Sequence, residues 1–160
     1  MDLNKKIEEI IPINDHEHRN EFSNSHLINQ LNEHEKKVVE DALIAKLQIY
    51  PEDTLIIETL SYMHSTEAVP DMLKSLEKCE IGLQKIIIAS AIFNLTKQDE
   101  MTDVALAEFK KLSKKWDLVF AFSYLSLFRD DRINNMIKDY CSNPDFLISY
   151  NAKEALKFID

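Results

Sequence analysis

Glycine is almost absent from this sequence, which has one among 160 residues, against an average usage of about 7%. Tight hairpin turns and phosphate-binding loops rely on glycine, because it adopts positive φ and lets the backbone approach a ligand closely. A hairpin-rich β fold and a Gly-rich nucleotide-binding α/β fold are therefore both disfavoured. The chain is nevertheless long enough to bury a core without metals or crosslinks.

Long apolar runs and paired cysteines are lacking as well. The longest uncharged apolar stretch, residues 86–95, is interrupted by Ser90 and Asn94 and is much shorter than the ~20 residues of a membrane span. The N-terminus alternates charges where a secretion signal needs an apolar segment. Cys79 and Cys141 form no Cys-x-x-Cys pair, so we expect reduced thiols. These observations favour a cytoplasmic protein without a membrane partner.

Basic residues are outnumbered by acidic ones. Nineteen Lys and Arg stand against 28 Asp and Glu, which gives a formal net charge of -9. Such a charge repels phosphate backbones at long range and argues against a nucleic-acid partner. We expect instead a protein partner that is basic or carries a charged face.

Apolar residues recur with helical period along nearly the whole chain. Residues 3–11 carry the stripe of a short amphipathic helix that Pro12 ends. Residues 14–25 are polar and rich in turn formers, which predicts a loop. Beyond them, breaks every dozen or so residues predict short antiparallel helices. We therefore expect an N-terminal amphipathic helix and polar loop over residues 1–25 and a helical-repeat domain over residues 26–160.

A weak internal repeat runs through the helical part of the chain. Four segments of equal length align, at positions 55–63, 87–95, 120–128 and 151–159, so that the repeat step is about 32 residues. The sixth position of each segment is apolar and predicts a buried helix face, while the fourth position is polar and predicts a solvent-exposed face. An amphipathic second helix follows each of the first three segments, so stacked helix pairs would share one core. The sixth-position residues are Leu60, Ile92, Leu125 and Leu156, and the fourth-position residues are Glu58, Ser90, Ser123 and Glu154.

One stretch resembles a known family. Residues 59–73 read Thr-Leu-Ser-Tyr-Met-His-Ser-Thr-Glu-Ala-Val-Pro-Asp-Met-Leu, which is similar to the HEAT-like repeat of the phycobilin-lyase type. In that pattern a helix end runs through a short turn into Ala-Val-Pro-x-x-Leu, with Pro70 in the first turn of the next helix. His64 and Ser65 replace the usual Gly-Asp. The resemblance implies an all-α, right-handed α-solenoid of about four helix pairs whose curved surface binds proteins; some relatives act on DNA bases or handle chromophores.

Lysines fall into columns when the second helices are superposed. Lys74, Lys110 and Lys138 share one column, and Lys78 and Lys114 share another one turn further on. These columns fit a cationic strip for an acidic peptide or a phosphate-bearing ligand, or else ordinary solvated positions on outward helix faces. Acidic residues on the helix faces would steer a basic partner. The candidate partner-binding residues are Glu67, Asp71, Lys74, Lys78, Lys110, Lys114 and Lys138.

Metal ligands and catalytic groups are sparse. Two His-Glu dyads supply ligand types for iron or zinc, but their separation is much shorter than one repeat step, so we expect solvated residues and no cofactor. Asp53 is expected to cap the helix that begins at Thr54, and His64 to lie in a turn or at a helix C-terminus. No Gly-x-Ser-x-Gly elbow occurs, and we expect no catalytic residues. The dyads are His16-Glu17 and His34-Glu35.

Aromatic residues gather toward the C-terminus. Trp116 follows four nearby lysines, as in some nucleic-acid patches, but the apolar residues around it favour burial, and we also expect the aromatic residues of 120–128 to be core. The last expected helix has no successor in this sequence to cover Phe146, Tyr150 or Phe158. Either this helix is polar enough to cap the stack, or a second copy or the partner covers it. We therefore expect a monomer or a weak homodimer through the C-terminal helix.

These features together predict a non-catalytic protein-binding module that masks or scaffolds a partner. An immunity protein that neutralises a toxin is one concrete version. The alternatives are an enzyme, either a HEAT-like DNA-base glycosylase with a positively charged channel or a metal-dependent hydroxylase that uses the two His-Glu dyads.

Overall fold

The computed structural model describes residues 3–13 and 22–157. Within these ranges the chain forms ten α-helices and two 3₁₀ helices and no β-strand, so the predicted all-α class is confirmed. The chain divides into two compact units, residues 1–78 and residues 79–160, called here the first and the second unit. Among the described helices, none has both the length and the apolar character that a bilayer-spanning segment needs.

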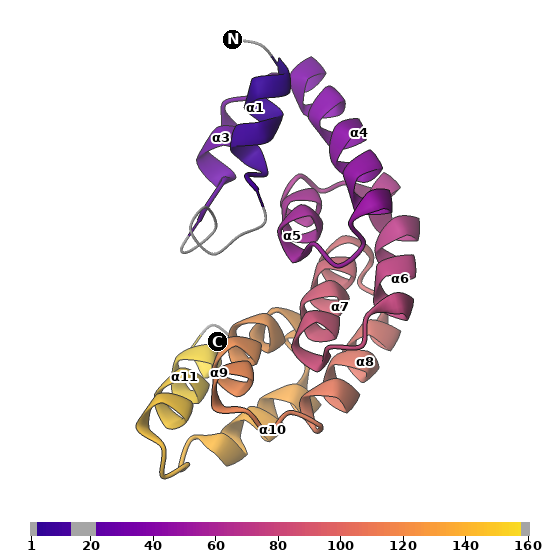
Figure 1. The fold of residues 1–160 in the computed structure, drawn as a ribbon. Helices are drawn as coiled ribbons and strands as arrows, with labels where there is room; N and C mark the ends of the chain where they lie inside the picture. The colour runs from indigo at the N-terminus through magenta and orange to yellow at the C-terminus, as the bar shows by residue number, and fades with distance from the viewer. Residues whose placement is uncertain (1–2, 14–21, 158–160) are drawn as a thin grey trace. The chain divides into compact units, whose positions relative to one another are not determined.

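The first unit is built around one long helix. That helix, α4, contacts α1, α5 and α6. Pro12 follows α1 closely, as predicted, and Pro70 is the second residue of α6, where its missing N–H breaks no helical hydrogen bond. The elements are α1 (Leu3–Ile10), α3 (Ser25–Asn29), α4 (Glu33–Ile49), α5 (Thr54–Tyr62), η1 (Thr66–Ala68) and α6 (Val69–Lys78) (Figure 1).

Side-chain caps fix where the helices of the first unit begin. Asn32 and Glu35 form a capping box at the start of α4: the Glu35 N–H donates to Asn32 Oδ1 at 2.9 Å, and the Asn32 N–H donates to Glu35 Oε2 at 3.0 Å. Asp53 accepts hydrogen bonds from the N–H groups of Leu55 and Ile56, which confirms the predicted cap of α5. Such a cap contributes about 1 kcal/mol.

A buried asparagine ties α1 into the first unit. Asn24 lies in the stretch predicted to be a polar loop, of which residues 14–21 lie outside the described part. Its Nδ2 donates to the Ile10 carbonyl at 3.0 Å and to Thr59 Oγ1 at 2.7 Å. The core around it comes from α1, α4, α5 and α6, and its largest fully buried side chains are Ile10, Leu43, Leu47, Ile56, Ile57, Leu60 and Met72.

The second unit contains two rows of helices. Helix α9 contacts both α7 and α11, while α8 packs against α7 and α10 against α11, so that α7, α9 and α11 form one row and α8 and α10 the other (Figure 1). The helices of the first row begin at positions 82, 115 and 146, a spacing close to the predicted repeat step. The elements are α7 (Gly82–Thr96), α8 (Asp99–Phe109), α9 (Lys115–Leu125), η2 (Ser126–Phe128), α10 (Asp131–Tyr140) and α11 (Phe146–Leu156).

Burial in the second unit follows the predicted columns in most positions. Ile92 and Leu125 are fully buried, and Leu156 is half-buried. A cluster of three rings joins the two rows: Phe122 lies 5.6 Å from Phe109 and 5.5 Å from Tyr140, between ring centroids. The fourth position of the repeat is not exposed to solvent in every copy, because Ser90 is buried. Its hydroxyl instead donates to the Ile87 carbonyl at 2.8 Å.

Three residues with positive φ follow the first helix of three successive helix pairs. His64, Lys97 and Arg129 have φ of 59°, 57° and 51° and follow α5, α7 and η2. Their positions in the sequence are spaced at the repeat step. This left-handed position is the usual end of a helix and is most often glycine, so the prediction that His64 ends a helix is confirmed.

Candidate functional site

The two acidic residues predicted to bind a partner already have contacts within the first unit. Glu67, in η1, accepts a hydrogen bond from Lys37 Nζ at 2.7 Å. Asp71, on α6, accepts from Lys74 Nζ at 3.0 Å and from Gln48 Nε2 at 3.2 Å. The bond from Lys74 holds the pKa of Asp71 below its ordinary value. Their role in binding a partner stays a prediction.

The predicted lysine columns are divided between the two units. Lys74 and Lys78 border a polar pocket of about 350 Å³ between α4 and α6 in the first unit. Lys110 ends α8, Lys114 precedes α9 and Lys138 lies on α10, all in the second unit. None of these three forms an ion pair with another described residue. Whether the five lysines act as one strip stays a prediction.

Only one of the two predicted histidine dyads, His34-Glu35, lies in the described part of the chain. His16 and Glu17 lie outside it. His34 is exposed in the first turn of α4, and the carboxylate of Glu35 accepts hydrogen bonds from Lys6 Nζ and the Asn32 N–H. The Lys6 ammonium lowers the pKa of Glu35. Glu35 is thus held by a lysine and a helix cap.

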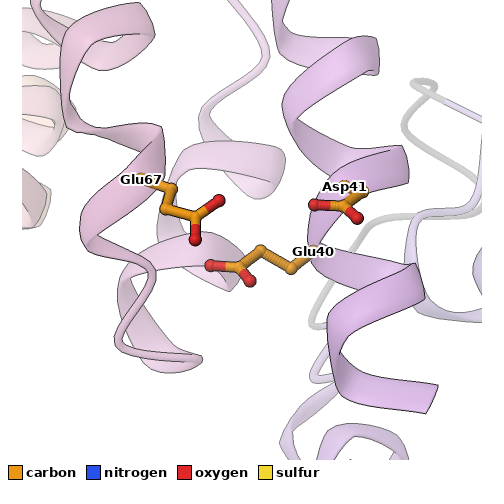
Figure 2. A group of neighbouring side chains, drawn as sticks. All are labelled: Glu40, Asp41 and Glu67. Atoms are coloured by element: carbon orange, nitrogen blue, oxygen red, sulfur yellow. The ribbon is translucent and has the colours of Figure 1, made fainter. Parts of the chain in front are cut away.

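A cluster of three carboxylates lies elsewhere in the first unit. Oxygens of Glu40 and Asp41, on α4, and of Glu67, in η1, all lie within 4.8 Å of one another. Figure 2 shows the Glu40 and Glu67 side chains extending toward each other from their two elements. Among the described residues, this is the one group of three potential metal ligands with oxygen, nitrogen or sulfur atoms so close.

A lysine supplies the cation for that cluster. Lys37 Nζ lies 3.2 Å from Glu40 Oε2, 3.0 Å from Asp41 Oδ1 and 2.7 Å from Glu67 Oε2. The hydrogen bond to Glu67, more than any other contact, raises the pKa of Lys37. We call Lys37 and the three carboxylates the Lys37 cluster. Its spacing of i+3 and i+4 along α4 could be read from the sequence, whereas the approach of Glu67 depends on the fold.

Exposed aromatic side chains mark α9 and α11. Trp116 and Phe120 are 58% and 55% exposed, and Phe146 and Tyr150 are 73% and 49% exposed. The rings form one pair on each helix, with centroids 6.4 Å apart on α9 and 5.8 Å apart on α11. We call these four residues the aromatic patch. The prediction that Trp116 and Phe120 are core is wrong, because the buried stripe of α9 is Leu118, Ala121, Phe122 and Leu125.

An ion pair brings the two halves of the aromatic patch to neighbouring helix ends. Lys115 Nζ lies 2.8 Å from Asp145 Oδ2. Lys115 is the first residue of α9, and Asp145 caps α11 by accepting from the N–H groups of Leu147 and Ile148. The Lys115 ammonium lowers the pKa of Asp145. Both aromatic pairs therefore lie in the first two turns of helices that pack against each other.

An open pocket of about 780 Å³ lies at the other end of the same helices. It is formed by the C-terminal halves of α7, α9 and α11 together with η2, all in the second unit. Its volume is within the usual range for small-molecule and cofactor sites. Its lining contains both apolar and polar side chains, and two of the polar ones are cations. We call it the α7–α11 pocket. Its lining includes Phe93, Lys97, Phe122, Ser123, Phe128, Arg129, Asn151 and Glu154.

Comparisons with known proteins provide no assignment. No protein-family model, no curated protein and no solved structure matches this chain. The resemblance of residues 59–73 to the HEAT-like family stays a prediction.

Proposed function

We propose that this chain is a helical-repeat protein that binds another protein without a catalytic role of its own, and that its helix pairs stack as a right-handed HEAT-like solenoid. The nearly even spacing between the starts of α7, α9 and α11 supports the stacking. So does the recurrence of a positive-φ residue at the end of successive first helices. Stacked pairs of this kind present extended binding surfaces.

The observation that carries the proposal is the aromatic patch. Burying a large apolar side chain stabilises a protein by about 1.5–3 kcal/mol relative to leaving it in water. Tryptophan, tyrosine and phenylalanine are enriched where proteins bind one another, and a few such residues dominate the binding energy. Four of them exposed on two packed helices therefore favour a partner that covers α9 and α11.

Masking is the mode of action we favour. A protein laid across α9 and α11 would have its own surface blocked, as an immunity protein blocks a toxin. A cytoplasmic location belongs to the same proposal. Steering of a basic face by Glu67 and Asp71 concerns the first unit and is a separate prediction.

The test is affinity capture from the native cell with the tagged full chain and two double variants. Trp116→Ala/Phe120→Ala removes half of the aromatic patch, and Ile49→Ala/Tyr50→Ala removes two comparably exposed side chains of the first unit. We expect a protein that is captured by the wild type and the control and is reduced at least ~10-fold by the patch variant. Titration of the purified partner should reproduce that order.

Two results would contradict the proposal. One is capture of no protein by the folded wild type. The other is equal capture by the wild type and by Trp116→Ala/Phe120→Ala. Sedimentation of the purified chain tests whether a second copy, rather than another protein, covers α11. A dimer that dissociates in the Phe146→Ala/Tyr150→Ala variant would show that it does.

A further inference from the structure

Two cations border the α7–α11 pocket, and both have the left-handed backbone conformation. Lys97 ends α7 with φ of 57°, and Arg129 ends η2 with φ of 51°. A residue with a side chain is disfavoured in this conformation by roughly 1–2 kcal/mol, which is why glycine is common there. A cation near a helix C-terminus offsets part of this through the helix dipole. That effect explains a positive charge at each helix end, but it does not require that both charges border one pocket.

Neither cation is neutralised within the described part of the chain. Lys97 Nζ lies 5.2 Å from the centroid of the Phe93 ring, and this cation–π contact leaves its hydrogen-bond donors unused by any carboxylate. Arg129 is exposed and forms no ion pair with a described residue. Glu154 is the carboxylate that lines the pocket, and it accepts from Lys157 Nζ at 2.5 Å. The pocket therefore has two positive charges available for an anion.

Apolar rings lie beside the cations. The Phe93 and Phe128 ring centroids are 4.8 Å apart, and Phe122 is buried beneath the pocket. Polar atoms are fewer: Asn151 Nδ2 donates to the Leu147 carbonyl at 2.8 Å, and the Ser123 hydroxyl donates to the Phe120 carbonyl at 2.9 Å. A ligand that fits this lining combines an anionic group with an apolar one.

The local charge also favours this location for an anion. The first unit has 8 basic and 16 acidic residues, a net charge of -8, and the second has 11 basic and 12 acidic residues, a net charge of -1. An acidic ligand is therefore repelled far less by the second unit than by the first.

We propose that the α7–α11 pocket binds an acidic segment of the partner protein. Aspartate or glutamate carboxylates of that segment engage Lys97 and Arg129, and an apolar side chain next to them packs on Phe93 and Phe128. This inference rests on the proposed function and adds the chemistry of the partner. Its residues are separate from the aromatic patch, so the two can fail separately.

The test uses a fluorescein-labelled peptide, Gly-Glu-Leu-Glu-Phe-Glu-Leu-Glu-Gly, and its match with every Glu replaced by Gln. Binding to the full chain is followed by fluorescence polarisation, and the contacted residues by shifts of backbone amide resonances. We expect the acidic peptide to bind at least ~10-fold more tightly than the Gln peptide, with a difference that shrinks as salt rises. The shifted amides should lie in residues 93–97 and 123–129.

Glycine variants separate charge from folding. Lys97→Gly/Arg129→Gly removes both cations at positions whose backbone favours glycine, so the variant should fold with a Tm close to or above that of the wild type. It should bind the acidic peptide at least ~10-fold more weakly. His64→Gly makes the same change in the first unit and should leave peptide binding within ~2-fold of the wild type.

Several outcomes would overturn the inference. Equal binding of the acidic and Gln peptides, or no binding of either, would show that the pocket does not take an acidic segment. Equal loss of binding in His64→Gly would place the effect outside the pocket. Decanoate that shifts the same amides while the peptide does not would identify a small amphiphilic carboxylate instead. A captured partner that depends on Trp116 but not on Lys97 and Arg129 would leave the proposed function standing and contradict this inference alone.

Discussion

The two units of this protein differ in how their exposed apolar side chains are arranged. Ion pairs occur in both units: Lys37 contacts three carboxylates in the first, and Lys115 pairs with Asp145 in the second. In the first unit, the exposed large apolar residues lie at or just beyond helix ends, as Ile49 and Tyr50 do at the end of α4. In the second unit, exposed aromatic residues lie in pairs on the faces of α9 and α11. Surface apolar residues need an explanation when they cluster, not when they occur singly.

The comparison shows how a net charge of -9 can mislead. That charge belongs almost entirely to the first unit, whereas the second unit is close to neutral. The whole-chain value suggests a basic partner. The second unit has the aromatic patch, and its Lys97 and Arg129 are unpaired among the described residues; both features fit the proposed partner, which is apolar and locally acidic.

The largest effect should separate two aromatic residues of α9. Phe122 is 1% exposed and contacts two other rings, so Phe122→Ala should lower the free energy of unfolding by about 3–5 kcal/mol. Trp116→Ala should change it by less than about 1 kcal/mol, because the ring is mostly in water. Urea unfolding measures both. A Trp116→Ala loss as large as that of Phe122→Ala would make the aromatic patch part of the core and remove the contrast between the units.

Helix caps should have similar effects in both units. Asp53 caps α5 in the first unit and Asp130 caps α10 in the second. Asp53→Ala and Asp130→Ala should each lower the free energy of unfolding by about 1 kcal/mol, since each leaves two helix N–H groups without an acceptor. Thermal unfolding measures the losses. Asn at either position keeps a side-chain acceptor and serves as the control.

The contribution of the Asp130 charge to stability should depend on pH. The hydrogen bond from Arg132 is the main cause that lowers the pKa of Asp130 in the folded protein. The stability contributed by its charge is therefore present above the ordinary pKa near 4 and is lost as pH falls through the lowered folded value. The difference in free energy of unfolding between the wild type and Asp130→Asn should therefore become smaller as pH falls through that range. A gap that stays constant down to pH 2 would show that the charge contributes nothing.

The smallest effect concerns the Lys37 cluster. Lys37→Ala leaves three carboxylates close together without their ammonium, and we expect a small loss of stability because the cluster is exposed. Millimolar Ca²⁺ should then raise the Tm of the variant more than that of the wild type, since carboxylate oxygens are its preferred ligands. Equal shifts in the two proteins would show that the lysine does not take the place of a metal ion.

Much of the fold could be predicted because its signals are local. Pro12, Asp53 and Pro70 set helix ends through their own backbone or side chain, and each lies where the sequence predicts. The repeat step could also be read from apolar columns. Burial at the edge of the apolar face of a helix could not be predicted, because it depends on what packs against that helix. Ser90 and Trp116 are examples.

The candidate sites depend on contacts between distant residues. Glu67 approaches Lys37 only because η1 lies beside α4, and the α7–α11 pocket takes its lining from three α-helices and η2. One signal was nevertheless available: His64, Lys97 and Arg129 are basic residues spaced at the repeat step. That all three end helices with positive φ is a property of the folded backbone and could not be read from the sequence.

Hydrogen exchange of the full chain with and without the captured partner tests the central claim most directly. We predict that bound partner slows exchange in α9, η2 and α11 of the second unit and in residues 93–97, while the Lys37 cluster on α4 and η1 exchanges as in the free protein. Protection confined to the first unit, with α9 and α11 unchanged, would contradict the account.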